Sequence, residues 1–127
     1  MLQFEIGREK GGLNFMNPFF KLYIEKNKDE KFVIMFAKKK LFNKGSNYII
    51  TLDKKKGKRD SELCLGKLRG DAAGDNYNLY NNGENPKQLN KIPINNIRNE
   101  YFGLEYRYVP CSIGRLRKTK LIMPALD

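Results

Sequence analysis

The sequence contains no histidine, so the commonest general base and the commonest metal ligand are both missing. It also contains no Gly-x-Ser-x-Gly word, no Walker loop and no Cys-x-x-Cys pair. The acidic residues are scattered among expected turns and strand ends, where solvated side chains are the ordinary outcome. We therefore expect a protein that is not an enzyme and that uses no metal and no cofactor. A carboxylate pair that meets only in the folded chain stays open.

Cysteine is scarce, and the two present, Cys64 and Cys111, lie far apart and match no metal-binding spacing. This favours a reducing compartment with buried or inert thiols over a disulfide framework. No apolar stretch approaches the roughly 20 residues that span a bilayer, and "MLQFEIGREK" lacks the apolar region of a signal peptide. We expect a cytosolic or nuclear protein that meets membranes only from outside.

Positive charge is what the sequence has in excess. Lysine and arginine number 25 against 14 acidic residues, which gives a formal net charge of +11. Such a balance predicts attraction to a polyanion, whether a nucleic acid, an anionic membrane surface or an acidic partner. Charge alone does not choose among these three.

Hydrophobic residues recur mostly with a period of two, which is typical of β-strands. With 127 residues, one domain with one modest core is expected. "LQFEIGR" and "FFKLYIEK" predict half-buried strands, and "KFVIMFA" predicts a strand that is apolar on both faces. Further strands are expected in "NYIITLD", "SELCLGKL", "DNYNLYNN", "EYFGLEYRYV" and "TKLIMP". The fold class is therefore mainly β, an antiparallel meander of about eight strands in a sandwich or a barrel.

Turn residues separate these runs. Asn82-Gly83 is the strongest short turn signal, and we expect Gly83 to take a positive φ and Pro86 to give a rigid exit. Pro93 and the surrounding asparagines predict a longer loop before the seventh strand.

Three consecutive lysines follow the third predicted strand. If the strand continues to Lys40, then Lys38 and Lys40 share one face, about 7 Å apart, and Lys39 faces the other way. Two ammonium groups in this arrangement can hold two phosphates. Lys67 and Arg69, in "GKLRG", approach the same place if their strand is a neighbour. The alternative is that the lysines form a solvated strand end.

The chain resembles the tubby C-terminal domain family from end to end. The resemblance lies in "KKKLFNKGSNYIITLD", in "LGKLRGDAAGDNYNLYNNGENP" and in "YVPCSIGRLRKTKLIMP", and "GREKGGLNFMNPFFKLYIE" resembles the family's opening strands. It implies a closed antiparallel barrel threaded by a hydrophobic helix. It also implies recognition of phosphoinositides such as phosphatidylinositol 4,5-bisphosphate, tethering at the cytoplasmic face of the plasma membrane and delivery of membrane-protein cargo, with a role in transcription as a further proposal.

The resemblance also suggests site residues. Lys38, Lys40 and Arg69 fall on the family's basic strand and on its Gly-Lys-Leu-Arg word, so they are the first-ranked phosphate ligands. Second-ranked candidates are Lys67, whose side chain could point to the opposite face, together with Lys44, Arg117 and Lys118. Asn82, Gly83, Asn85, Pro86, Gly66 and Ser46-Asn47-Tyr48 are interpreted as turn or packing residues.

Two departures from the family pattern matter. Leu41 and Phe42 stand where further lysines are expected, and they either insert between lipid head groups or pack against the neighbouring strand. The chain also ends at "LIMPALD", about halfway through the family domain, so residues 1–127 are expected to form a single partial domain that lacks the central helix. Exposed barrel edges then predict self-association, or an excerpt of a longer protein.

Two other classes of function stay open. A basic β domain that binds nucleic acid would use the charge and the tyrosines, but no recognition helix or RNP-like word is visible, and the tyrosines alternate as core positions do. An adaptor barrel whose lysines reflect codon bias is the third class.

Overall fold

The protein is described from a computed structural model, which covers residues 2–10, 18–27, 30–41, 44–54, 62–88 and 90–125. Within these ranges the elements are β-strands and short 3-10 turns, which confirms the mainly β class. In chain order the strands are β1 Gln3–Glu9, β2 Phe19–Asn27, β3 Glu30–Lys39, β4 Asn47–Thr51, β5 Cys64–Gly70, β6 Asn76–Tyr80, β7 Glu100–Cys111 and β8 Gly114–Ile122.

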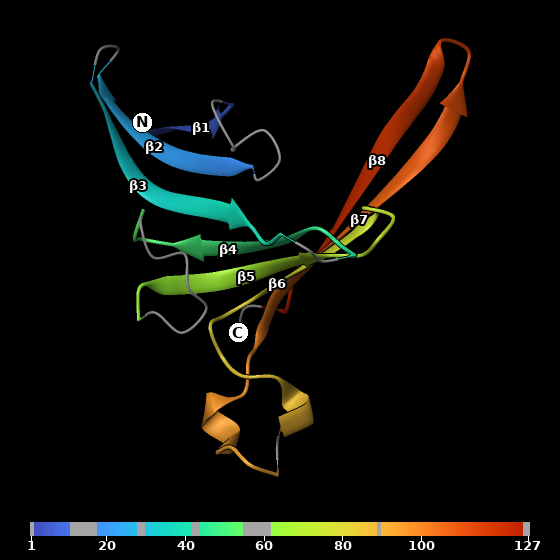
Figure 1. The fold of residues 1–127 in the computed structure, drawn as a ribbon. Coiled ribbons are helices and arrows are strands. Elements are labelled where there is room, and N and C mark those ends of the chain that lie inside the picture. Colours follow the sequence, from blue (N-terminus) through green and yellow to red (C-terminus); the bar gives the residue numbers. More distant parts are fainter. Residues whose placement is uncertain are drawn as a thin grey trace.

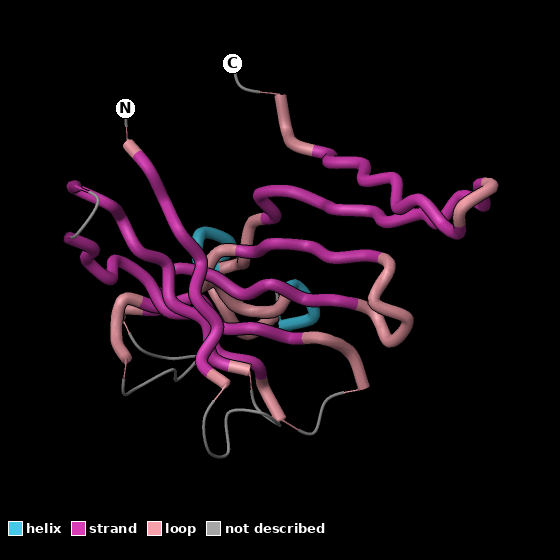
Figure 2. The backbone as a smooth tube through the Cα atoms, turned by 90° about the horizontal axis from the view of Figure 1, so that it is seen from above, coloured by secondary structure: helices cyan, strands magenta, loops and turns pink. Residues whose placement is uncertain are grey.

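The strands form one sheet in which each pairs antiparallel with the next along the chain, from β1 to β8. This confirms the meander. The sheet curls into a half-barrel (Figures 1 and 2), so the barrel alternative holds and the sandwich is excluded. Irregular register within the β2–β3, β4–β5 and β6–β7 pairs adds bends to the natural twist of the strands and favours the curl.

The two faces of the sheet differ in chemistry. Because directly opposed residues of an antiparallel pair project to the same side, the register assigns each side chain to a face. One face carries Leu68, Tyr77, Phe102 and Leu104, and we call it the apolar face. The other carries Lys38, Lys67 and Arg69 together with the buried Ile49, and we call it the basic face.

Tight burial is concentrated where β2 to β5 meet. Phe19, Ile49 and Cys64 are buried, and the Phe19 ring stacks on Phe36 with centroids 5.7 Å apart. Both cysteines are free, with Cys64 buried, as predicted.

Three burial predictions are wrong. Leu2, Phe4 and Ile6, expected to be half-buried, are exposed by 56–72%, because β1 is an edge strand with a neighbour on one side only. Phe32 and Val33 at the start of β3 are also largely exposed, since β4 pairs only with the later part of β3, from Phe36 onward. Tyr108, one of the tyrosines that alternate as core positions do, is 56% exposed because it lies beyond the end of the β6 pairing.

A long connection, residues 81–99, joins β6 to β7. It contains two 3-10 helices, η2 Pro86–Gln88 and η3 Ile94–Asn96, and a parallel bridge between Glu84 and Ile97. The longer loop before the seventh strand is confirmed. Asn82-Gly83 lies inside this connection and does not join two neighbouring strands as a tight hairpin.

Gly83 is needed for a reason other than the predicted one. Among the described glycines only Gly74 and Gly114 have positive φ, so the expectation for Gly83 is wrong. A Cβ at position 83 would stand 2.5 Å from the backbone N and Cα of Arg98. The two arms of the connection therefore approach so closely that only glycine fits.

No helix among the described residues is long and apolar enough to cross a membrane.

Substituting Gly83→Ala is expected to lower the free energy of unfolding by about 1–3 kcal/mol, because the methyl group displaces backbone atoms of Arg98. Gly103→Ala is the matched control, since a Cβ there meets its first neighbour, Asn78, at an ordinary 3.5 Å. Urea unfolding measures both. An equal, small effect of the two substitutions would contradict the close approach.

The turn between β5 and β6 is organised by Asp71. Its carboxylate accepts hydrogen bonds from the Asn76 side chain at 2.7 Å and from the backbone amides of Gly74 and Asp75 at 2.6 and 3.0 Å. The bond from Asn76, reinforced by the two amides, holds the pKa of Asp71 below its ordinary value of 3.8.

This lowered pKa predicts acid sensitivity. A carboxyl group with a lower pKa in the folded than in the unfolded chain adds stability above the unfolded pKa and loses it as pH falls through the folded pKa. The Tm difference between the unsubstituted protein and Asp71→Asn should therefore shrink as pH is lowered from neutral to below 3.8. A difference that stays constant across this range would show that the charge of Asp71 contributes nothing.

Candidate functional site

Four cations lie on the basic face at the corners of a small frame. Lys38 is opposite Ile49, which is opposite Lys67, so all three side chains share that face. One step along, Asn47 is opposite Arg69, and the Lys40 amide donates to the Asn47 carbonyl at 2.8 Å, which extends the β3–β4 ladder to Lys40. The frame measures about 7 Å along the strands and about 10 Å across them, from the standard strand spacings.

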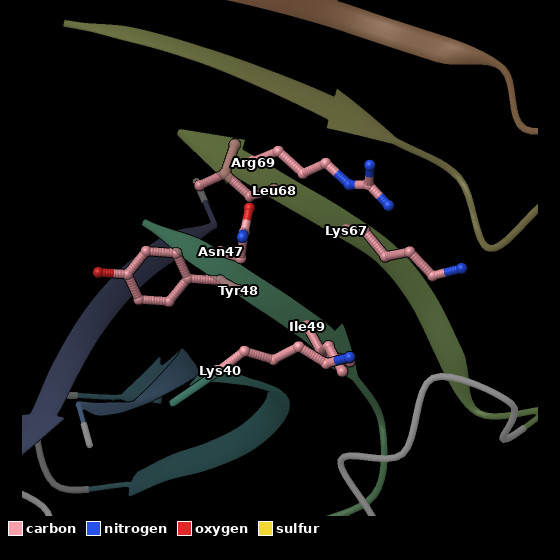
Figure 3. Close-up of a pocket in the computed structure, with 7 residues that line it drawn as sticks. All are labelled: Lys40, Asn47, Tyr48, Ile49, Lys67, Leu68 and Arg69. Carbon is pink, nitrogen blue, oxygen red and sulfur yellow. The ribbon is translucent and has the colours of Figure 1, made fainter. Parts of the chain in front are cut away.

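A pocket of about 280 Å³ opens within this frame. Lys40, Asn47, Ile49, Lys67 and Arg69 contribute to its lining. In Figure 3 the cationic ends of Lys40, Lys67 and Arg69 project to one side of β4 and β5, and the Tyr48 ring projects to the other. The pocket is therefore an open, positively charged hollow suited to an anion with more than one charged oxygen group.

Lys67 is the most buried of the four cations of the frame. Its face, which the sequence left open, is the basic face. The side chain is only 5% exposed, and its Nζ donates to the carbonyl oxygens of Asn82 and Gly83 at 3.0 and 3.3 Å. Lys67 thus ties the 81–99 connection to the sheet while contributing its charge to the pocket.

Arg69 is positioned by an aromatic ring. Its guanidinium carbon lies 5.7 Å from the Tyr80 ring centroid, and that of Arg98 lies 4.5 Å from the same centroid. Cation–π contacts of this kind restrict the side chain. Arg98 comes from the distant connection, and the word "INNIRN" around it carries no signal that sequence reasoning could have used.

Lys38 and Asn47 differ in how they meet the pocket. Lys38 is exposed on the basic face but borders the pocket without lining it, since the hollow lies toward Lys40. Asn47, interpreted from sequence as a turn or packing residue, lines the pocket between Lys40 and Arg69. Strand alternation plus the β4–β5 register would have identified it.

Three second-ranked candidates lie elsewhere. Lys44 is exposed in the turn before β4. Arg117 is on the apolar face with its guanidinium carbon 4.4 Å from the Tyr106 ring centroid, and it lines a separate hollow there. Lys118 is exposed on the basic face of β8, opposite Arg107. The structure therefore brings Lys38, Lys40, Lys67 and Arg69 together and leaves these three outside the frame.

Leu41 directly follows the frame and is 48% exposed, while Phe42 lies outside the described residues.

Tyr48 contributes no charge to the pocket. Its ring makes an edge contact with Phe20 on the apolar side, with centroids 6.0 Å apart. Burial raises the pKa of the Tyr48 hydroxyl, so the phenol stays neutral at physiological pH. In the described ranges, no three metal-ligating side chains are grouped so as to hold a metal ion.

Comparison with known proteins identifies the family. The model of the Tub family matches residues 1–127. The chain belongs to the Tub family. It is 30% identical over its whole length to tubby-related protein 2 of Mus musculus, and 27% identical over 94% of its length to tubby-related protein 3 of Homo sapiens. Tubby protein homolog 1 of Caenorhabditis elegans is 27% identical over 96% of the chain. The tubby-like resemblance and the β-barrel assignment are thereby confirmed.

The chain spans only about a quarter of the length of these relatives, between 23 and 29%.

Replacing Lys67 with methionine keeps the aliphatic stem and removes the charge. Because two carbonyls lose a charged donor in a buried position, the free energy of unfolding should fall by about 1–3 kcal/mol. The exposed Lys38→Met is the matched control and should change it by less than about 0.5 kcal/mol. Denaturant unfolding compares them, and an unchanged midpoint for Lys67→Met would refute its anchoring role.

Proposed function

We propose that this protein is a non-catalytic, phosphoinositide-binding module of the phosphatidylinositol 4,5-bisphosphate type. The observation that carries the proposal is the frame of Lys38, Lys40, Lys67 and Arg69 around one open pocket. Membership of the Tub family supports it, because the frame coincides with the basic words that link the chain to that family.

The frame suits a head group with adjacent phosphates. Lysine ammonium groups act as compact point charges, whereas the arginine guanidinium offers a planar fork that can hold two oxygens of one phosphate. Tyr80 restricts Arg69, so less side-chain entropy is lost when a phosphate binds. Asn47 adds an uncharged amide between the cations, suited to a sugar hydroxyl or a phosphate oxygen.

The charges also supply general membrane attraction. Each cation near an anionic leaflet contributes on the order of 1 kcal/mol, so four give roughly 4 kcal/mol before screening by salt. Leu41, exposed next to Lys40, would add apolar contact with the lipid layer if it inserts.

In the cell, we propose that the module tethers a protein to the cytoplasmic face of the plasma membrane and takes part in membrane-protein trafficking as an adaptor. The membrane protein would be its cargo, and pairing with a second copy through the sheet edges β1 and β8 is a further proposed interaction. Nucleic-acid binding is the competing function, and a nuclear location would accompany it.

Vesicle co-sedimentation tests the lipid proposal. Vesicles containing phosphatidylinositol 4,5-bisphosphate are compared with phosphatidylserine vesicles of matched charge. The unsubstituted protein should prefer the bisphosphate, and Lys38→Ala/Lys40→Ala should weaken that binding on the order of tenfold. Equal binding to both lipids would refute stereospecific recognition.

A matched control separates site from net charge. Lys87→Ala/Lys91→Ala removes the same charge from two exposed lysines on the 81–99 connection and should leave the preference intact. Equal loss in both double variants would reduce the proposal to non-specific attraction. Parallel titration with duplex and single-stranded DNA tests the competing function, which gains support if DNA binds more tightly than the bisphosphate vesicles at the same salt concentration.

A further inference from the structure

The end of the β7–β8 hairpin stands apart from the rest of the sheet. β6 pairs with β7 only as far as Glu105, with one further hydrogen bond from the Tyr106 amide to the Asp75 carbonyl at 2.7 Å. From Arg107 to Lys118 the two strands pair only with each other among the described residues. We call residues 107–118 the ribbon, and Figures 1 and 2 show it extending beyond the other strands.

The ribbon leaves the sheet at the end where the basic frame lies. Asn47, Arg69 and Asn78 lie opposite one another across β4, β5 and β6, and the residue of β7 opposite Asn78 is Gly103. From there the strand runs on through Glu105 and Arg107 to the turn after Cys111, about 27 Å farther by the strand rise. The ribbon thus projects past the frame and away from the 81–99 connection.

Aliphatic side chains are exposed at the tip of the ribbon. Ile113, in the turn, is 93% exposed, and Leu116 is 59% exposed. Leu116 faces Val109 on the basic face. Within the part of the chain that the structure describes, these side chains have no core contact that would explain them, since every residue from Ser112 to Lys120 is exposed. An isolated two-stranded ribbon also gains little stability from such residues.

The charge around the tip has one sign. From Tyr106 to Leu126 the sequence has five cations and no acid. Arg107, Lys118 and Lys120 lie on the basic face, as the frame does. The Nε of Arg107 donates to the Glu105 carboxylate at 2.7 Å, on the sheet side of the ribbon. A branched aliphatic tip surrounded by cations matches what an anionic lipid surface requires, because the apolar side chains enter the acyl boundary and the cations stay among the head groups.

We propose that the ribbon is a second membrane contact, in which Ile113 and Leu116 insert into an anionic bilayer and Arg107 and Lys118 hold its head groups. The inference rests on the proposed function only for the choice of a bilayer as the partner. Because the ribbon and the frame belong to one sheet, simultaneous contact would raise the effective concentration of each at the surface. A nucleic acid offers the cations a partner but gives the exposed aliphatic tip none.

The absence of tryptophan from the sequence provides a direct test. Ile113→Trp introduces a single indole at the tip, the tip fluorophore. Ile94→Trp introduces one at a 75%-exposed position in η3, the control fluorophore on the 81–99 connection. With phosphatidylserine/phosphatidylcholine vesicles, emission of the tip fluorophore should shift to the blue and be quenched by brominated lipid, while that of the control fluorophore should not. Absence of the shift in vesicle-bound protein, or equal shifts at both positions, would overturn the proposal.

Substitution tests the same contact by affinity. Ile113→Ser/Leu116→Ser should weaken binding to these vesicles on the order of tenfold, with an unchanged Tm because both side chains are exposed. An unchanged affinity would refute insertion. A concentration-dependent dimer without vesicles that the serine variant abolishes would assign the tip to a second copy of the chain. If duplex DNA shields the tip fluorophore from water and vesicles do not, the tip is a nucleic-acid contact.

The phosphoinositide site and the ribbon can fail separately. When Lys38→Ala/Lys40→Ala is combined with Ile113→Trp, the blue shift on phosphatidylserine vesicles should persist, because the ribbon needs no bisphosphate. If the protein with the intact frame binds both lipids equally while the tip fluorophore still shifts, the proposed function fails and the ribbon contact stands. If the bisphosphate preference holds while the tip fluorophore stays in water, the ribbon contact fails alone.

Discussion

Antiparallel register is the constraint on which the candidate site depends. Opposed residues of neighbouring strands share a face, so the pairing of Ile49 with both Lys38 and Lys67 places two lysines from distant parts of the chain on one side. The next row does the same for Arg69 through Asn47. A slip of one residue in the β4–β5 pairing would send Lys67 and Arg69 to the apolar face and disperse the frame. The site is therefore a property of the sheet and not of the lysine run alone.

Buried contacts hold that register in place. Ile49, at the centre of the frame, is 4% exposed, and Lys67 bonds the carbonyls of the 81–99 connection beneath the pocket. Arg98 of the same connection and Arg69 of the frame both make cation–π contacts with the Tyr80 ring. The connection, which the sequence predicted only as a long loop, thus helps to position Lys67 and Arg69 of the frame. Its close approach at Gly83 is part of the same arrangement.

Much of the fold was predictable because period-two patterns and turn residues are local signals. All eight strands overlap the segments that alternation and turn chemistry predicted, although β8 begins at Gly114, five residues before the predicted "TKLIMP". The faces of Lys38 and Lys40 follow from alternation within one strand. Contacts between distant segments were not predictable. The role of Asn47 needs the β4–β5 register, and Arg98 reaches Tyr80 only through a connection whose path depends on Gly83 and Lys67. Exposure of Phe4, Ile6 and Tyr108 was missed because alternation reports the direction of a side chain and not what covers it.

The most direct test of a single register-built site is residue-resolved NMR of the lysine and arginine side chains during titration with the soluble head group of phosphatidylinositol 4,5-bisphosphate. Signals of Lys40, Lys67 and Arg69 are expected to shift together along one binding curve, with Lys38 following. The signal of Arg117, on the opposite face, should stay unchanged. Shifts spread evenly over all cations, Arg117 included, would contradict the claim that register builds one phosphate site on one face.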